Sequence, residues 1–72
     1  MSNQEPALIF AKTIRQARKR RGWSQWTLAK QAGLSRPTVA RIETGKFVNT
    51  SSLTKIAKAL DLSVSMEQLG NN

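Results

Sequence analysis

The 72-residue chain contains no cysteine and no histidine. Without these residues a disulfide, a thiol nucleophile, an imidazole acid–base catalyst and a zinc site of the usual kind are excluded. Acidic residues are scarce as well: Asp and Glu together number 4, and they form no pair suited to acid–base catalysis. A glycine loop that could cradle a phosphate is also missing. We therefore expect no enzyme and neither a metal nor an organic cofactor.

Long apolar runs are absent too. No stretch approaches the roughly 20 apolar residues that a membrane-spanning helix needs, and no apolar signal-peptide core is present. We therefore expect a soluble, cytoplasmic protein. A chain of this length forms one domain with a modest core, in which an enclosed catalytic pocket is hard to fit.

Positive charge is what the chain has in excess. Its net charge is +8, from 12 Lys and Arg against 4 Asp and Glu. All 12 basic residues lie between residues 11 and 60, where Glu43 is the single acid, so this stretch carries +11. Such a field favours polyanions, and nucleic acid is the leading candidate partner. An anionic membrane surface is a weaker rival, and a charge that only keeps the protein soluble is the third interpretation.

Apolar residues recur at helical spacing, and no long stretch alternates as a strand would. Four groups each predict one buried helix face: Phe10, Ile14 and Ala17; Leu28, Ala29 and Ala32; Val39 and Ile42; and Leu53, Ile56, Ala57 and Leu60. A last short turn is expected after a cap at Ser65. The sequence therefore predicts an all-α fold, a compact bundle of four helices and a short fifth.

Cap and stop residues predict where the middle helices begin and end. Ser24 and Ser35 are favourable N-caps, and Gly33 is a favourable stop for the second helix. Only Leu34 and Ser35 separate Gly33 from the next helix, which indicates a tight helix-turn-helix. The third helix is expected over about residues 36–44.

The outer boundaries follow from the same signals. The fourth helix is expected to be capped by Asn49 or Ser51. Residues 1–6 are predicted to be a flexible lead-in, residues 7–69 the domain, and residues 70–72 a tail.

Three motifs, in order and at matching spacing, resemble the Cro/phage-repressor type of helix-turn-helix domain, the XRE family. They are R-x-x-x-G-x-S-Q-x-x-L-A from Arg18, A-G-L-S-x-x-T-V-x-R-I-E-x-G from Ala32, and L-x-x-I-A-K-A-L from Leu53. The resemblance covers about residues 10–69. It implies a lambda-repressor-like domain that binds double-stranded DNA, acts as a transcriptional regulator, specifically a repressor, and works as a homodimer on a near-palindromic operator.

The resemblance also implies that the third helix enters the major groove with its amino end. Because Val39 and Ile42 face the core, the opposite side carries the candidate base-reading residues, which are Arg36, Pro37, Ala40 and Arg41. Arg36 is expected to bond guanine O6 and N7, whereas Pro37 and Ala40 offer only apolar contact. For both arginines the alternative is a solvated charge.

Candidate phosphate contacts lie at helix starts and in the loop after the third helix. A helix N-terminus attracts anions through its free N–H groups and its dipole. The candidate phosphate-binding residues are Ser24, Gln25, Thr38, Thr44, Lys46 and Asn49. For Thr38 a capping hydroxyl is the alternative, and for Gln25 and Lys46 it is a solvated side chain.

The resemblance also implies that Arg18 and Glu43 of this chain form a structural ion pair. Such a pair would tie the third helix to the first, and a bidentate geometry adds specificity. The rest of the basic run from Arg18 to Arg21 is interpreted mainly as the solvated end of the first helix.

The two tryptophans are expected to differ. Trp23 precedes the cap Ser24 and is predicted to be a core or staple residue. Trp26 stands where the family usually has a polar residue, away from the buried face of its helix, and is expected to be substantially exposed. It packs along a DNA strand, meets a protein partner, or folds over a neighbouring helix.

A different function also fits a small protein of the XRE type. As the antitoxin of a toxin–antitoxin pair it would bind a toxin as well as its own operator, with Trp26 or the segment Ala7–Phe10 facing that partner. Non-specific or RNA binding is a third possibility, although an aromatic platform for single strands is not evident. The expected partners are therefore double-stranded DNA, a second copy of the chain and, in the alternative, a toxin, but no membrane; DNA binding would place the protein at the nucleoid.

Overall fold

The computed structural model describes residues 5–46 and 48–62, and within them all regular structure is helical. The helices are α1 (Glu5–Arg20), α2 (Gln25–Ala32), α3 (Arg36–Glu43) and α4 (Thr50–Ala59). The predicted all-α fold with four helices is confirmed. The short fifth turn expected after Ser65 lies outside the described residues, as does the predicted tail.

Two helix boundaries differ from the expected ones. α1 begins at Glu5, so the predicted lead-in of residues 1–6 overlaps the helix by two residues. Pro6 permits this, because an amide in the first turn of a helix has no intrahelical partner to lose. α3 ends at Glu43, one residue early, and Thr44 is its C-cap.

The three N-caps and the turn between α2 and α3 form as the sequence predicts. Ser24, Ser35 and Asn49 each accept a hydrogen bond from the backbone N–H three residues on, at 3.1, 3.3 and 2.7 Å. Asn49 therefore caps α4, and of the two alternatives Ser51 is excluded. Gly33 takes the left-handed conformation that ends α2, with φ of 72°.

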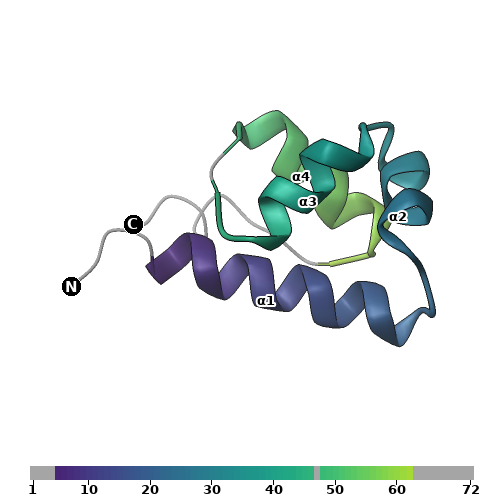
Figure 1. Ribbon diagram of the computed structural model, residues 1–72, viewed down its shortest axis with the longest axis horizontal. Helices are drawn as coiled ribbons and strands as arrows, with labels where there is room; N and C mark the ends of the chain where they lie inside the picture. Colours follow the sequence, from purple (N-terminus) through teal and green to yellow (C-terminus); the bar gives the residue numbers. More distant parts are fainter. Residues whose placement is uncertain (1–4, 47, 63–72) are drawn as a thin grey trace.

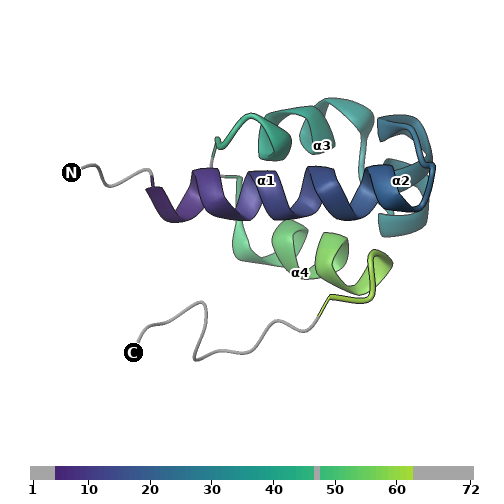
Figure 2. The same cartoon turned by 90° about the horizontal axis from the view of Figure 1, so that it is seen from below.

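α3 is held between two neighbours. Figure 1 shows α1 running along one side of the other helices, and α3 packs against both α1 and α2, while α4 packs against α2. In the view from below, α1 crosses the front of the molecule with α3 on one side and α4 on the other (Figure 2). No helix in the described part of the chain is long and apolar enough to cross a membrane.

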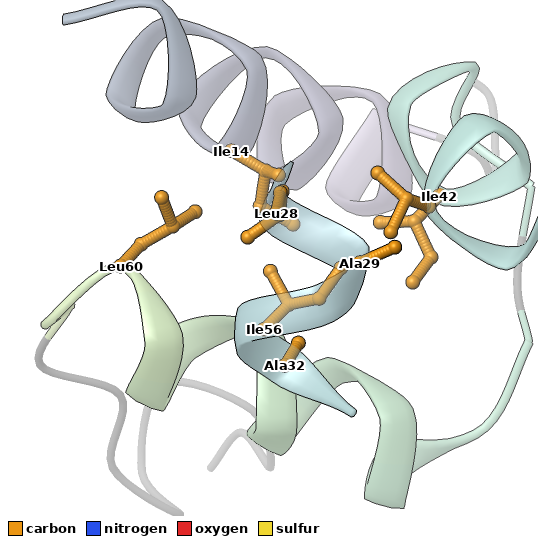
Figure 3. Close-up of a cluster of buried hydrophobic side chains, with 8 residues drawn as sticks. Ile14, Leu28, Ala29, Ala32, Ile42, Ile56 and Leu60 are labelled. Carbon is orange, nitrogen blue, oxygen red and sulfur yellow. The ribbon is translucent and has the colours of Figure 1, made fainter. Parts of the chain in front are cut away.

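The core draws on every helix (Figure 3). Its buried residues are Ile14, Leu28, Ala29, Ala32, Val39, Ile42, Ile56 and Leu60, in agreement with the predicted faces. Phe10 and Ala17 are only partly buried and pack against the edge of this core. Ala11, by contrast, is 2% exposed, so the buried stripe of α1 runs through Ala11, Ile14 and Arg18. This rotation of the stripe brings an arginine to the inner side of α1.

Gly45 ends the turn after α3 and lies close to α1. Its φ is 85°, a conformation that L side chains rarely adopt. A Cβ atom there would stand 2.6 Å from Leu8 Cδ2. The glycine therefore permits the close approach of this turn to the first turns of α1.

Candidate nucleic-acid interface

A bidentate ion pair anchors the carboxyl end of α3. Arg18 Nε and Nη2 donate to Glu43 Oε2 and Oε1 at 2.6 and 3.0 Å. The side chains are only 11% and 2% exposed. Arg18 Nη1 also donates to the carbonyl of Trp23 at 2.8 Å, so the guanidinium ties α1 to the α1–α2 turn as well. The pair has the structural character that the resemblance implied.

Arg15 adds a second anchor, which the sequence did not single out. Its Nη1 donates to the backbone carbonyl of Glu43 at 3.2 Å. The last carbonyls of a helix lack intrahelical partners and carry the negative end of the helix dipole. A guanidinium at this end donates a hydrogen bond to such a carbonyl and interacts favourably with the dipole. The available signal was the i, i+3 spacing of Arg15 and Arg18, which places both on one side of α1.

Gln25 connects this anchor to the other end of α3. Its Nε2 donates to Glu43 Oε1 at 3.1 Å, and its Oε1 accepts from Arg36 Nη1 at 2.8 Å. The two bonds fix the orientation of the amide, because only oxygen can accept from a guanidinium. Gln25 is therefore not merely a solvated side chain. A continuous chain of bonds runs from Arg18 through Glu43 and Gln25 to Arg36.

Arg36, the first residue of α3, is half-buried rather than freely solvated. Besides its bond to Gln25, its guanidinium carbon lies 5.9 Å from the centre of the Trp26 ring. Trp26 is 70% exposed, which confirms that its side chain lies largely in solvent. Because Gln25 and Trp26 both belong to α2, the starts of α2 and α3 lie beside each other.

The remaining base-reading candidates share the surface of α3 with Arg36. Pro37 and Arg41 are exposed, and Ala40 is half-buried. Val39 and Ile42 are buried on the opposite side, as expected. α3 therefore presents a basic and apolar outer face, which begins at the end held by Gln25.

The candidate phosphate-binding residues fall into two kinds. Those with short polar side chains already make local hydrogen bonds. Ser24 contacts the Thr27 hydroxyl at 3.1 Å, Thr38 contacts the Ser35 hydroxyl at 2.9 Å, Thr44 donates to the Arg41 carbonyl at 2.8 Å, and Asn49 caps α4. Lys46 differs, because it is an exposed charge in the loop that follows α3.

The basic run at the end of α1 is less uniformly solvated than expected. Arg21 Nη2 donates to the carbonyl of Leu60, the C-cap of α4, at 2.7 Å, and its guanidinium carbon lies 5.3 Å from the Trp23 ring. Arg21 is therefore a structural residue, because it satisfies a helix-end carbonyl. Lys19 and Arg20 are exposed, and Trp23 packs against the core.

The described residues contain no group of three acidic, His or Cys side chains that could hold a metal. An open groove of ≈ 580 Å³ lies between the start of α1 and the end of α3, and its lining includes Leu8, Ile9 and Lys12. It contains Glu43 as its one acid, and that carboxylate is committed to the ion pair.

Comparison with known proteins shows to which protein family the chain belongs. A family model described as helix-turn-helix matches residues 14–66. The chain belongs to the helix-turn-helix family, whose members bind double-stranded DNA. This confirms the resemblance read from the sequence, and it agrees with the expectation of a protein that is not an enzyme.

One particular relative is similar to nearly the whole chain. The HTH-type transcriptional regulator PrtR of Pseudomonas aeruginosa is 39% identical over 69 residues, which is 96% of this chain. The chain spans 27% of the length of that relative. The similarity therefore concerns the helix-turn-helix portion of a much longer regulator.

Proposed function

We propose that the chain is the DNA-reading domain of a transcriptional regulator, a repressor, which recognises a specific duplex with the amino end of α3 in the major groove. One observation carries the proposal: a chain of side-chain bonds from Arg18 to Gln25 holds Arg36 at the start of α3. Family membership and the similarity to a transcriptional regulator support it.

The dimensions of α3 and the donors of Arg36 suit a major groove. Eight residues rise about 12 Å, close to the groove width of about 12 Å. A guanidinium has five N–H donors, and Gln25 takes one at 2.8 Å. The remaining donors suffice for the bidentate bond to guanine O6 and N7. Arg41 would extend the reading surface, and Pro37 and Ala40 would contact a thymine methyl.

Phosphate contacts would flank the reading helix on both sides. On one side stand the first-turn amides of α2 together with Ser24 and Gln25, whose Nε2 keeps a second hydrogen beside the one given to Glu43. On the other side stand Thr44, Lys46 and Asn49, and Thr38 lies within α3 itself. Each phosphate neutralised should steepen the dependence of log K on log salt by about 0.9.

A dimer on a near-palindromic operator completes the proposal. Two reading helices of a symmetric dimer would lie about 34 Å apart, one turn of duplex, so the half-sites would repeat at about 10 base pairs. We propose α4 or the loop at Val48 as the surface that pairs the copies. Such a protein would act in the cytoplasm, at the nucleoid.

Selection of bound duplexes from a random pool tests this function. At a fixed salt concentration of about 0.15 M, the wild-type chain should enrich a two-fold symmetric site with a guanine in each half-site. The Arg36→Ala chain, selected in parallel, should lose the preference at that guanine while retaining the symmetry. Enrichment of no sequence by the wild-type chain would refute the proposed function.

A second candidate function is favoured by one observation, the exposed apolar start of α1. Leu8 is 47% and Ile9 is 65% exposed beside the open groove. An antitoxin would use such a surface to bind its toxin while α3 still bound the operator. Purification from the native cell with a stoichiometric protein partner, lost on Ile9→Asp, would support this function; purification alone would count against it.

A further inference from the structure

Packing of the hydrophobic core does not explain why Trp26 lies at the surface. The indole is 70% exposed in the first turn of α2, whereas the residues that this helix buries are Leu28, Ala29 and Ala32. A large aromatic side chain left in solvent usually serves a contact. The Arg36 guanidinium carbon lies over the Trp26 ring, 5.9 Å from its centre.

Arg36 is thereby held by two neighbouring residues of α2 in two different ways. Gln25 Oε1 accepts one Nη1 hydrogen at 2.8 Å, and the guanidinium carbon lies over the Trp26 ring. A cation within about 6 Å of the centre of an indole face is attracted by the ring quadrupole. The hydrogen bond fixes one nitrogen, and the ring restricts the swing of the guanidinium about that bond.

Restricting an arginine before it binds raises its selectivity for a planar target. A free arginine side chain loses several rotatable bonds when it pairs with a base, and a side chain held beforehand loses less. The gain is largest for the base whose two acceptors match the orientation in which the guanidinium is held. A holding contact therefore raises affinity for the matching base more than affinity for other bases.

We propose that Trp26 is a positioning residue for base recognition: its indole face, together with Gln25, holds Arg36 so that its other donors meet a guanine. The inference rests on the proposed function. It assigns to Trp26 a role through Arg36, and no direct contact with DNA. It also gives a reason for an exposed indole beside a hydrogen-bonding glutamine at the start of α2.

NMR of the free protein tests the holding contact without DNA. The side-chain proton signals of Arg36 should be shifted by the indole ring current in the wild type. The shift should vanish in Trp26→Ala and persist, reduced, in Trp26→Phe. The Arg21–Trp23 pair, at 5.3 Å, is the internal control, because its signals should be the same in all three chains.

Competition binding tests the consequence for specificity. The ratio of affinities for the selected duplex and for a duplex with its half-site guanine changed should fall about two- to fivefold in Trp26→Ala. Trp26→Phe should retain most of the ratio. In an Arg36→Ala background the substitution of Trp26 should have no further effect on it. Gln16→Ala, at an exposed residue of α1 to which no binding role is assigned, is the control and should leave the ratio unchanged.

The outcomes separate this inference from the proposed function. An equal loss of affinity for both duplexes in Trp26→Ala, or an effect that persists without Arg36, would overturn the positioning role and indicate direct packing of the indole on the DNA strand. A wild type that discriminates between duplexes but shows no Trp26-dependent shift of Arg36 would overturn the inference alone. A wild type with that shift and no discrimination would refute the proposed function, and the role in specificity with it.

Discussion

The two ends of α3 are held in different ways. At the carboxyl end Glu43 is 3% exposed, its carboxylate is bonded to Arg18 and Gln25, and its carbonyl is bonded to Arg15. At the amino end Arg36 is half-buried and faces two side chains of α2, and Pro37 beside it is exposed. One end is fixed in the scaffold, and the other is presented at the surface.

Gln25 is the residue common to both ends. Because one amide bonds Glu43 and Arg36, the position of the presented arginine depends on the buried ion pair through two hydrogen bonds. The 12 basic residues of the chain therefore have different roles at the two ends. Three arginines bond to other elements of the fold, namely Arg15, Arg18 and Arg21. Two further basic residues, Arg41 and Lys46, face solvent.

Breaking the fixed end should have the largest effect. Glu43→Gln leaves Arg18 with its side chain 11% exposed and without its charge partner. Removing one partner of a buried pair is costly, so the free energy of unfolding should fall by about 3 kcal/mol. Urea denaturation measures this change. Asp61→Asn, at an exposed acid, is the control and should leave the midpoint nearly unchanged; equal midpoints for the two variants would contradict the anchoring role.

Removing the presented side chain should alter recognition more than stability. Arg36→Ala should lower discrimination at one base pair by about 1–3 kcal/mol, because a bidentate bond to guanine is lost. Competition between the selected duplex and its single-base variants measures the effect. Lys30→Ala, an exposed charge on α2, is the control and should keep the discrimination. Uniform weakening on every duplex would argue that Arg36 contacts phosphate instead.

The basic run at the end of α1 tests whether structural and solvated arginines can be distinguished. Arg21→Ala removes the bond to the Leu60 carbonyl and should lower the free energy of unfolding by about 1 kcal/mol, since the residue is partly in solvent. Arg20→Ala removes an exposed charge only and should cost less. Thermal or urea unfolding of both variants checks this, and indistinguishable stabilities would remove the assigned capping role of Arg21.

The smallest effect is expected in the loop after α3. Lys46→Ala should reduce the magnitude of the slope of log K against log salt by about 0.9, because one phosphate contact is lost. Affinity for all duplexes should fall together. Titrations at several salt concentrations measure the slope, with Lys30→Ala, an exposed charge on α2, as the control. A slope identical to that of the wild type would exclude Lys46 from the phosphate contacts.

Local signals in the sequence predicted the elements of the fold well. Cap residues such as Ser24 and Asn49 act within three residues of themselves, so their hydrogen bonds can be read from spacing alone. The buried faces of α2 to α4 follow from the 3.6-residue period for the same reason. Ala11 escaped notice because a small side chain gives a weak apolar signal beside Phe10.

The links between elements were harder to predict. Arg15, Arg21 and Gln25 reach partners 28, 39 and 18 residues away, and nothing in the local pattern fixes such distances. Exposure of Trp26 was predictable from its place off the buried face. Its contact with Arg36 was not, because it depends on how the starts of α2 and α3 meet.

NMR titration of the labelled protein with its selected duplex shows which part of the fold contacts DNA. The largest changes in amide signals should fall on the starts of α2 and α3, at residues 24–27 and 35–41, and then in the loop around Lys46. Changes concentrated instead on the start of α1 or on the outer face of α4, with residues 35–41 unaffected, would contradict the claim that the amino end of α3 reads DNA.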